Sequence, residues 1–300
     1  MYDVFCTGVT CCDLIFAGLE KFPQLGADVF CKKFMIKPGG MSNTPMGLAK
    51  LGLDSVFFTR VGTDTMGEIV YNFMEKTGLN MAAVFRDKDY QTAVSAVLTV
   101  GYERGFASYE DRSDKVIDIN EIETYVKNSR HVHSSLNDCI KLPLAKLAEK
   151  HGKTLSIDAG WTESIKLDDL KHLLSKCTIF TPNEIEAINI TGAEKAEDAL
   201  EILSRYAKIN VIKLGKKGCI AKEGDRTIRV DAVKEIKPVD TTGAGDLFNA
   251  GLIYGFLKGW KLERALSFAN VAGGLAVTYY GGIDEDFTLE RVNSLMGKYY

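Results

Sequence analysis

The sequence of 300 residues is poor in histidine, proline and tryptophan, and it contains no apolar run long enough to cross a bilayer. Its four histidines show no His-x-x-x-His spacing, and Cys11-Cys12 has no second pair at metal-ligand spacing, which argues against a zinc site. The seven cysteines are scattered and odd in number, so reduced thiols are expected. The first residues lack a basic segment followed by a cleavage site, and we expect a cytoplasmic protein with no membrane partner.

No block rich in lysine and arginine is present, and the formal net charge is −3. Proteins that bind nucleic acid usually carry a basic patch, so this balance argues against a nucleic-acid partner. Hydrophobic residues make up 46% of the sequence, which is ample for a packed core. The length allows one large domain or two smaller ones, and we predict a single domain over residues 1–300.

An apolar strand end, a glycine turn and a long apolar helix follow one another in residues 237–251. Gly243, Ala244 and Gly245 carry almost no side chain, so a ligand can approach backbone N–H groups that have no partner within the coming helix. Such a helix start favours an anion. The carboxylate of Asp246, in the first turn, would repel a bound polyphosphate unless it interacted with another group, such as the proton of an attacking hydroxyl. Asp246 is therefore a candidate general base. The alternative is a tight turn followed by an acid that complements the helix dipole.

Buried strands alternate with helices along most of the chain. Strand-like runs are expected near residues 4–9, 55–61, 131–135, 154–158 and 177–181, and again from residue 211. This alternation predicts an α/β fold whose mostly parallel sheet binds ligands at the carboxyl ends of its strands, where Asp158 and Asn183 lie.

Residues 14–36 and 92–110 alternate like β-hairpins instead, and we expect them to form a small β-lid. An exposed sheet of this kind commonly packs on a copy of itself. We therefore predict a homodimer that forms through the lid.

Two further stretches allow both a structural and a functional interpretation. Asp13 follows the first strand in an apolar run, where a carboxylate needs a partner or a ligand unless it lies in an exposed turn. Residues 39–43, Gly-Gly-Met-Ser-Asn, suit a turn and a capped helix start. Asn183 and Glu186 share one face at i, i+3 spacing, and alone they are typical of an asparagine cap with an acidic first turn.

Three motifs occur in the order found in the ribokinase-like (PfkB) carbohydrate kinases, and the sequence resembles that family from residue 3 to about residue 285. The motifs are residues 37–52, Thr181-Pro-Asn-Glu-Ile-Glu-Ala187 and Asp240-Thr-Thr-Gly-Ala-Gly-Asp246. The resemblance implies a ribokinase-like α/β fold, with a central mostly parallel sheet flanked by helices on both faces and a small β-sheet lid. It also implies ATP-dependent phosphorylation of a hydroxyl on a small sugar, of the ribokinase or fructokinase type.

The resemblance also assigns roles to matching positions. Asp246 would be the general base, and the anion hole for the transferring phosphate would be formed by Gly243, Ala244 and Gly245. Glu186 would position magnesium through water, and a potassium ion would lie near Asp240, Thr242 and Gly281. The residues implied to hold the sugar are Asp13, Gly39, Gly40 and Asn43. Those implied to contact the nucleotide are Asn183, Lys213, Gly215, Gly218 and Asn270.

The sequence departs from the family pattern in two places. Asp158-Ala-Gly-Trp161 replaces Asp-Pro-Asn-x-Arg, so any role of that arginine in binding is missing or supplied elsewhere. The pair Gly39-Gly40 also lies one residue closer to Asn43 than in the family. A Walker A motif is missing, and no Gly-x-Gly-x-x-Gly follows the first strand, which argues against two other common nucleotide-binding folds.

Asp13 and Asn43 suit hydrogen bonds to uncharged hydroxyls. We therefore expect a neutral ketose, pentose or hexose as substrate, ahead of a nucleoside and then a sugar phosphate. A sugar phosphate would need a cationic clamp, for which the nearest candidates are Lys32, Lys33 and Arg104. The alternative functions are a nucleoside kinase on the same scaffold and a sugar-binding regulator without catalysis.

Overall fold

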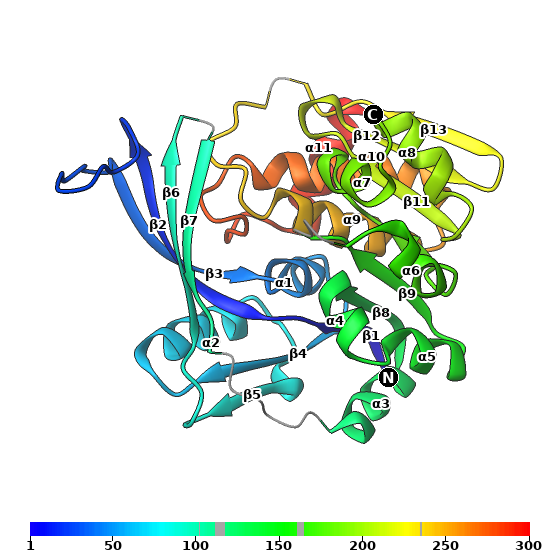
Figure 1. Cartoon of the computed structure of the whole chain (residues 1–300), viewed down its shortest axis with the longest axis horizontal. Helices are drawn as coiled ribbons and strands as arrows, with labels where there is room; N and C mark the ends of the chain where they lie inside the picture. The colour runs from blue at the N-terminus through cyan, green and yellow to red at the C-terminus, as the bar shows by residue number, and fades with distance from the viewer. Residues whose placement is uncertain (102, 112–117, 161–164, 235) are drawn as a thin grey trace.

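Two β-sheets of unequal size, with helices packed around the larger one, make up the structure (Figure 1). It is a computed structural model that describes residues 1–101, 103–111, 118–160, 165–234 and 236–300. Trp161, which stands in the segment that departs from the family pattern, lies outside these residues. No helix within these ranges is long and apolar enough to cross a membrane.

The large sheet has nine strands in the order β13-β12-β11-β10-β9-β8-β1-β4-β5. Neighbouring strands from β5 to β11 are parallel, whereas β12 and β13 pair antiparallel at one edge. All but two of the strand pairs are therefore parallel, and parallel neighbours are usually connected by a helix that crosses over the sheet. The strands are β1 (Tyr2–Thr7), β4 (Ser55–Gly62), β5 (Val84–Asp87), β8 (Ser129–Ser135), β9 (Thr154–Asp158), β10 (Ile179–Phe180), β11 (Ile209–Lys213), β12 (Cys219–Glu223) and β13 (Arg226–Val230).

Helices cover both faces of this sheet, and the central strand β1 shows why. Successive side chains of a strand point to opposite faces. Phe5 accordingly packs into one hydrophobic cluster, while Val4 and Cys6 pack into another, and all three are fully buried. The first cluster includes residues of α3 (Ile119–Lys127), α4 (Leu136–Lys141), α5 (Leu144–Lys150), α6 (Leu167–Leu174), α7 (Glu184–Thr191) and α8 (Ala196–Leu203). The second includes residues of α1 (Asn43–Lys50), α2 (Thr65–Lys76), α9 (Ala244–Leu257), α10 (Leu262–Ala276) and α11 (Leu289–Tyr299).

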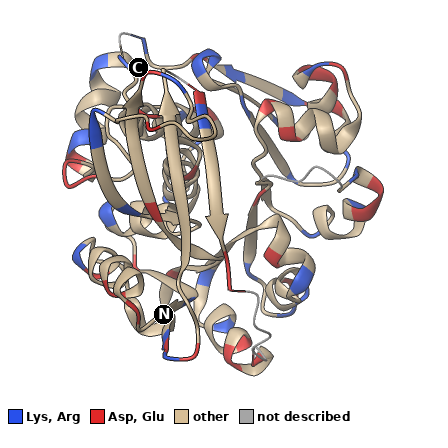
Figure 2. Ribbon diagram, turned by 60° about the vertical axis from the view of Figure 1, so that its left-hand side comes forward, with Lys and Arg blue, Asp and Glu red and all other residues tan. Residues whose placement is uncertain are grey.

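The small sheet has the order β3-β2-β6-β7 and contains strands from both segments expected for the lid. Its strands are β2 (Thr10–Leu19), β3 (Lys33–Gly40), β6 (Ala93–Val100) and β7 (Glu103–Tyr109). The two hairpin-like segments meet through a parallel pairing of β2 with β6. Charged residues are sparse on these strands, whereas lysine, arginine, aspartate and glutamate intermingle over the rest of the molecule (Figure 2).

Some local expectations were wrong, each for an identifiable reason. The spacing of Thr65 and Glu68 predicts a capping box, but Asp64 caps α2 by accepting a hydrogen bond from the Gly67 N–H at 2.9 Å. One helix is expected over 141–151, but α4 ends at Lys141 and α5 begins at Leu144, because Pro143 cannot sit inside a continuous helix.

Candidate active site

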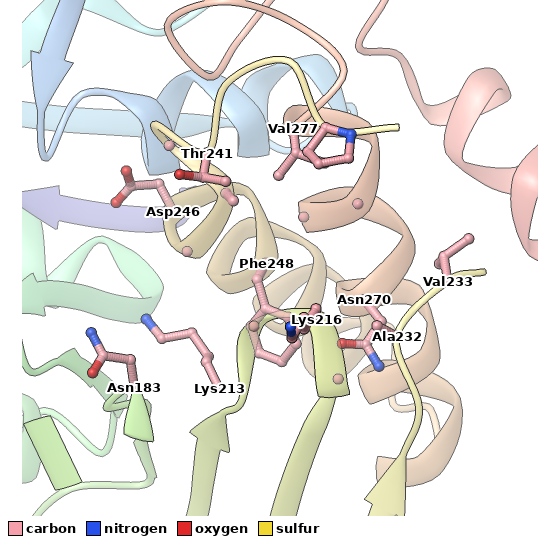
Figure 3. A pocket seen from close by; sticks show the side chains of 18 of the residues that line it. Asn183, Lys213, Lys216, Ala232, Val233, Thr241, Asp246, Phe248, Asn270 and Val277 are labelled. Carbon is pink, nitrogen blue, oxygen red and sulfur yellow. The ribbon is translucent and has the colours of Figure 1, made fainter. Parts of the chain in front are cut away.

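A cavity of about 610 Å³ lies at the carboxyl ends of the central strands, where α9 begins. Figure 3 shows the side chains of Asp246, Lys213 and Asn183 around one end of this cavity and that of Asn270 at the other. These residues come from α9, β11, the start of α7 and α10. Other predicted site residues that line the cavity are Glu186, Gly215, Gly218, Gly243, Ala244 and Gly245.

The glycine turn before α9 is enforced by its neighbours. Gly243 is the N-cap residue of α9 and has a left-handed conformation with a φ of 71°. A β-carbon there would lie 2.7 Å from the Gly282 Cα and 3.3 Å from the Asn43 Nδ2. Glycine caps the helix without a side chain, and the Ala244 N–H donates to the Thr241 carbonyl oxygen at 3.4 Å, so the N–H groups after it in the first turn of α9 are left for another acceptor. The turn thus presents backbone donors and the positive end of the helix dipole to the cavity.

Asp246 lies in the first turn of α9, beside this turn. The pKa of its carboxyl group is raised to about 7, because removal from water and the negative charge of Asp158 outweigh the opposing effect of the Lys213 ammonium. The Thr44 hydroxyl donates to the Asp246 carbonyl oxygen at 3.2 Å and lies 3.5 Å from Oδ1. A carboxyl group with a pKa near neutrality is suited to taking a proton from a hydroxyl.

The residues predicted to hold a sugar come together on the lid side of this turn. Asp13 is 7% exposed, and its carboxyl group occupies the space that a β-carbon of Gly39 would fill. Asn43 is 2% exposed and lies against Gly243, and its Oδ1 has no hydrogen-bond partner within the described part of the chain. Gly40 ends β3 beside them. A buried amide oxygen without a partner is suited to a ligand hydroxyl.

The Asp13 carboxyl group is itself perturbed. Its pKa is raised to about 6, because burial and the charge of Asp240 outweigh the hydrogen bond that the Cys11 thiol donates at 3.2 Å. The cysteine contact was not anticipated from the sequence, although residues 11 and 13 of one strand point to the same face. Asp13 is therefore largely ionised at neutral pH and accepts hydrogen bonds.

Asn183 and Glu186 form the capping box that the structural interpretation expects. The Glu186 N–H donates to Asn183 Oδ1 at 2.9 Å, and the Asn183 N–H donates to Glu186 Oε2 at 2.7 Å. The pKa of Glu186 is raised to about 7, because burial and the charge of Asp158 outweigh the opposing charge of Lys213. The cap occupies one carboxylate oxygen, so the other is left for a hydrated ion.

The described residues hold no group of three or more His, Cys, Asp or Glu side chains arranged to bind a metal directly. The three acids Asp158, Glu186 and Asp246 nevertheless line one cavity. Such a donor set fits magnesium bound through water, because magnesium prefers oxygen and retains several water ligands.

The opposite end of the cavity is more apolar. Asn270 lies in its wall, but its Nδ2 donates to the carbonyl oxygens of Val230 and Asp231 at 3.2 and 3.1 Å. Its amide nitrogen therefore anchors the end of β13. The apolar residues of the cavity wall were not predicted from the sequence, because they form no motif and resemble ordinary buried residues of helices and loops. They include Ala232, Val233, Ile236, Phe248 and Val277.

The three residues predicted to hold a monovalent cation are adjacent. Asp240 accepts hydrogen bonds from the Thr242 N–H and hydroxyl at 3.0 and 2.8 Å and from the Gly281 N–H at 2.9 Å. Arg104 reaches this loop from β7, and its Nη1 donates to the Thr242 hydroxyl at 3.1 Å. Nothing in the sequence connects two residues that lie 138 positions apart.

Comparison with known proteins decides the family. The model of the pfkB family of carbohydrate kinases matches residues 1–288. The chain belongs to the PfkB family. It is a carbohydrate kinase of the ribokinase-like type, and the predicted family and fold are confirmed.

The relatives of this PfkB kinase are distant. An ATP-dependent 6-phosphofructokinase from Thermoanaerobacterium thermosaccharolyticum is 26% identical, with 98% of this chain and 94% of that protein aligned. A ribokinase from Arabidopsis thaliana is 27% identical, with 90% and 74% aligned. The structure of Arabidopsis thaliana ribokinase complexed with ribose and ATP superposes with a TM-score of 0.84 at 23% identity, covering 98% of each chain.

Proposed function

We propose that this kinase transfers the γ-phosphoryl group of ATP to a hydroxyl of a small neutral sugar, as ribokinases and fructokinases do. The observation that supports this most directly is the position of Asp246. Its carboxyl group, with a pKa of about 7, lies beside the glycine turn and between the Asp13 and Asn43 side and the large cavity. A base, an anion site and two hydrogen-bonding side chains therefore lie around one point.

In the proposed reaction Asp246 accepts the proton of the sugar hydroxyl as the oxygen of that hydroxyl bonds to the γ-phosphorus. The bond from the γ-phosphorus to the bridging oxygen breaks, and its electron pair leaves with ADP. Phosphoryl transfer has a loose transition state, so catalysis depends mainly on positioning and on neutralising charge. The N–H groups of the turn formed by residues 243–245 supply donors for the charge that develops on the phosphoryl oxygens.

Glu186 would hold magnesium through water, and the ion would neutralise phosphate charge when bound. A potassium ion would bind near the loop of Asp240, Thr242 and Gly281. Asp240 is 5% exposed, and it forms no ion pair with any residue that the structure describes. A buried carboxylate of this kind favours a bound cation.

The neutral-sugar proposal is supported by the side chains near Asp246. Asp13 accepts hydrogen bonds, and the amide of Asn43 both donates and accepts them. Lys33, on β3 of the lid, places its Nζ 4.6 Å from the centre of the Tyr280 ring, in the loop that follows α10. A sugar phosphate is the second candidate, because Arg104 reaches Thr242 beside the glycine turn.

A coupled assay for ADP release tests the proposal. Pentoses, ketoses and hexoses form one panel, nucleosides a second and sugar phosphates a third, with Asp246→Asn as the inactive control. We expect strong turnover with a member of the first panel and loss of its binding in Asp13→Ala. Turnover confined to sugar phosphates would refute the neutral-pocket argument.

We also propose that the kinase is a homodimer formed through the lid. Several of its exposed large hydrophobic side chains lie on the small sheet or in the loop between β2 and β3. On the strands, Phe34 and Tyr109 lie on the same face of the sheet and are 50 and 49% exposed. A second copy of the same sheet offers a self-complementary apolar partner for them.

A further inference from the structure

Lys213 ends β11 with its ammonium group inside the cavity. Its Nζ donates a hydrogen bond to Asp158 Oδ1 at 2.9 Å, and both side chains are 13% exposed. A β-carbon built on Gly245 would lie 3.4 Å from this Nζ. The ammonium group therefore lies beside the glycine turn that opens α9, where Figure 3 shows it extending toward the side of the cavity occupied by Asp246.

Three carboxylates surround this one buried cation. Burial alone would lower the pKa of Lys213, but the charges of Asp158, Glu186 and Asp246 raise it above its ordinary value. Lys213 is thus held in its charged form. An ammonium group has three N–H donors. Among the described residues Asp158 is the only hydrogen-bond partner of Nζ, which leaves donors for a ligand.

We propose that Lys213 is a catalytic residue that binds the γ-phosphoryl group of ATP through its ammonium and neutralises charge during its transfer. Asp158 holds the ammonium in place before the nucleotide arrives. The inference rests on the proposed kinase reaction, to which it adds a third participant besides the general base and the anion hole. As the sugar oxygen bonds to the γ-phosphorus, the proton goes to Asp246 and the leaving electron pair to ADP. Lys213 keeps its own protons throughout.

A different role for Lys213 makes a different prediction. If the pair with Asp158 only joined β9 to β11, removal of the ammonium would weaken folding and affect every nucleotide alike. A direct contact with the γ-phosphoryl group affects ATP but not ADP, because ADP lacks that group. The two roles are therefore separated by comparing the affinities of the two nucleotides.

The experiment measures dissociation constants by calorimetry for a non-hydrolysable ATP analogue and for ADP, with magnesium and without sugar. Charged hydrogen bonds contribute about 1.5–3 kcal/mol, so Lys213→Met should weaken binding of the analogue by roughly tenfold to 150-fold. ADP binding should change by less than about threefold. The control is Lys208→Met, which removes the same charge from an exposed position just before the opposite end of β11 and should leave both affinities unchanged.

Asp158→Asn completes the comparison. Asp158→Asn is introduced into the wild type and into Lys213→Met, and the fold-change in analogue affinity is measured in each. If the two side chains act as a pair, these two fold-changes should differ by more than about twofold. Should Lys213→Met unfold, Lys213→Gln keeps a donor toward Asp158 and takes its place, with the same expected loss for the analogue. Equal weakening of analogue and ADP, or no change in either, overturns the proposal.

Kinetics with the sugar that the assay identifies supply the catalytic test. Loss of a donor to the developing charge typically lowers kcat by about 100- to 1,000-fold. We expect that loss in Lys213→Met, with the KM for sugar nearly unchanged. If no sugar supports turnover even in the wild type, the proposed function fails while the nucleotide comparison still reports on Lys213.

Discussion

Asp246→Asn should lower the rate and raise the stability of the enzyme at alkaline pH. The asparagine keeps the shape of the side chain but cannot accept the sugar proton. General bases typically contribute about 100- to 10,000-fold, so we expect kcat to fall within that range. Sugar affinity should change little, because Asp13 and Asn43 remain and the amide oxygen of the new asparagine can still accept the hydrogen bond from the Asn43 side chain.

The stability effect follows from the pKa of Asp246. The folded-state pKa of about 7 lies above the ordinary value of 3.8, so the folded protein holds this proton more tightly than the unfolded chain does. Any stability gained by this protonation is present in full below the unfolded pKa and is lost as the pH rises through about 7. At 1.36 kcal/mol per pKa unit, this difference between the folded and unfolded pKa destabilises the folded protein by up to about 4 kcal/mol at pH 8 and roughly 2 kcal/mol at pH 5.

These magnitudes are ceilings, because the half-buried carboxylate retains part of its hydration. The measurement is thermal or urea unfolding of both proteins between pH 5 and pH 8. Asp246→Asn should be the more stable of the two at pH 8, and the advantage should shrink toward pH 5. A stability difference that does not vary with pH would refute the electrostatic reasoning, and a near-normal kcat would refute the assignment of the base.

The remaining predictions concern pH, ions and assembly. Because Asp246 must be ionised to act, kcat/KM should fall by about tenfold per pH unit well below pH 7, and a flat profile from pH 5 to 8 would exclude this base. Glu186→Gln should raise the magnesium concentration needed for half-maximal activity without changing sugar affinity, and an unchanged magnesium titration would leave Glu186 as a helix cap only. Potassium should accelerate turnover over a bulky organic cation buffer, and equal rates would count against the Asp240 site. Sedimentation should show a dimer that Phe34→Asp dissociates and Ile140→Asp, on α4, does not; a monomeric wild type would contradict the lid interface.

The main sheet was predictable because its strands are buried on both faces and read as apolar runs. Val4, Phe5 and Cys6 illustrate this, since each lies in a core on one side or the other. The ends of the helices were harder to predict from the sequence. Pro143 divides one expected helix, and Asp64 rather than Thr65 caps α2. The other carboxylate oxygen of Asp64 accepts a hydrogen bond from the backbone N–H of the distant Thr92 at 2.8 Å, a contact that local spacing does not reveal.

The candidate site was predictable where consecutive residues make it. The turn at 243–245 and the pair of Asn183 and Glu186 are local arrangements, and their spacing alone indicates their geometry. Contacts between segments that are distant in the sequence cannot be predicted from local spacing. The sequence placed Lys213 at a strand end and Arg104 at a lid tip, but the ion pair with Asp158 and the hydrogen bond to Thr242 depend on how the sheets close.

Burial, and after it the charge of Asp158, explains why the pKa values of Glu186 and Asp246 lie near neutrality. Lys213 is one cation facing the three carboxylates Asp158, Glu186 and Asp246. A polyphosphate would add further negative charge, so the cavity favours a nucleotide that brings a cation with it. Bound magnesium would stabilise the ionised forms of Glu186 and Asp246, and Asp246 must be ionised to accept the proton. Binding of the nucleotide with its metal would therefore prepare the base at the moment when the sugar hydroxyl needs it.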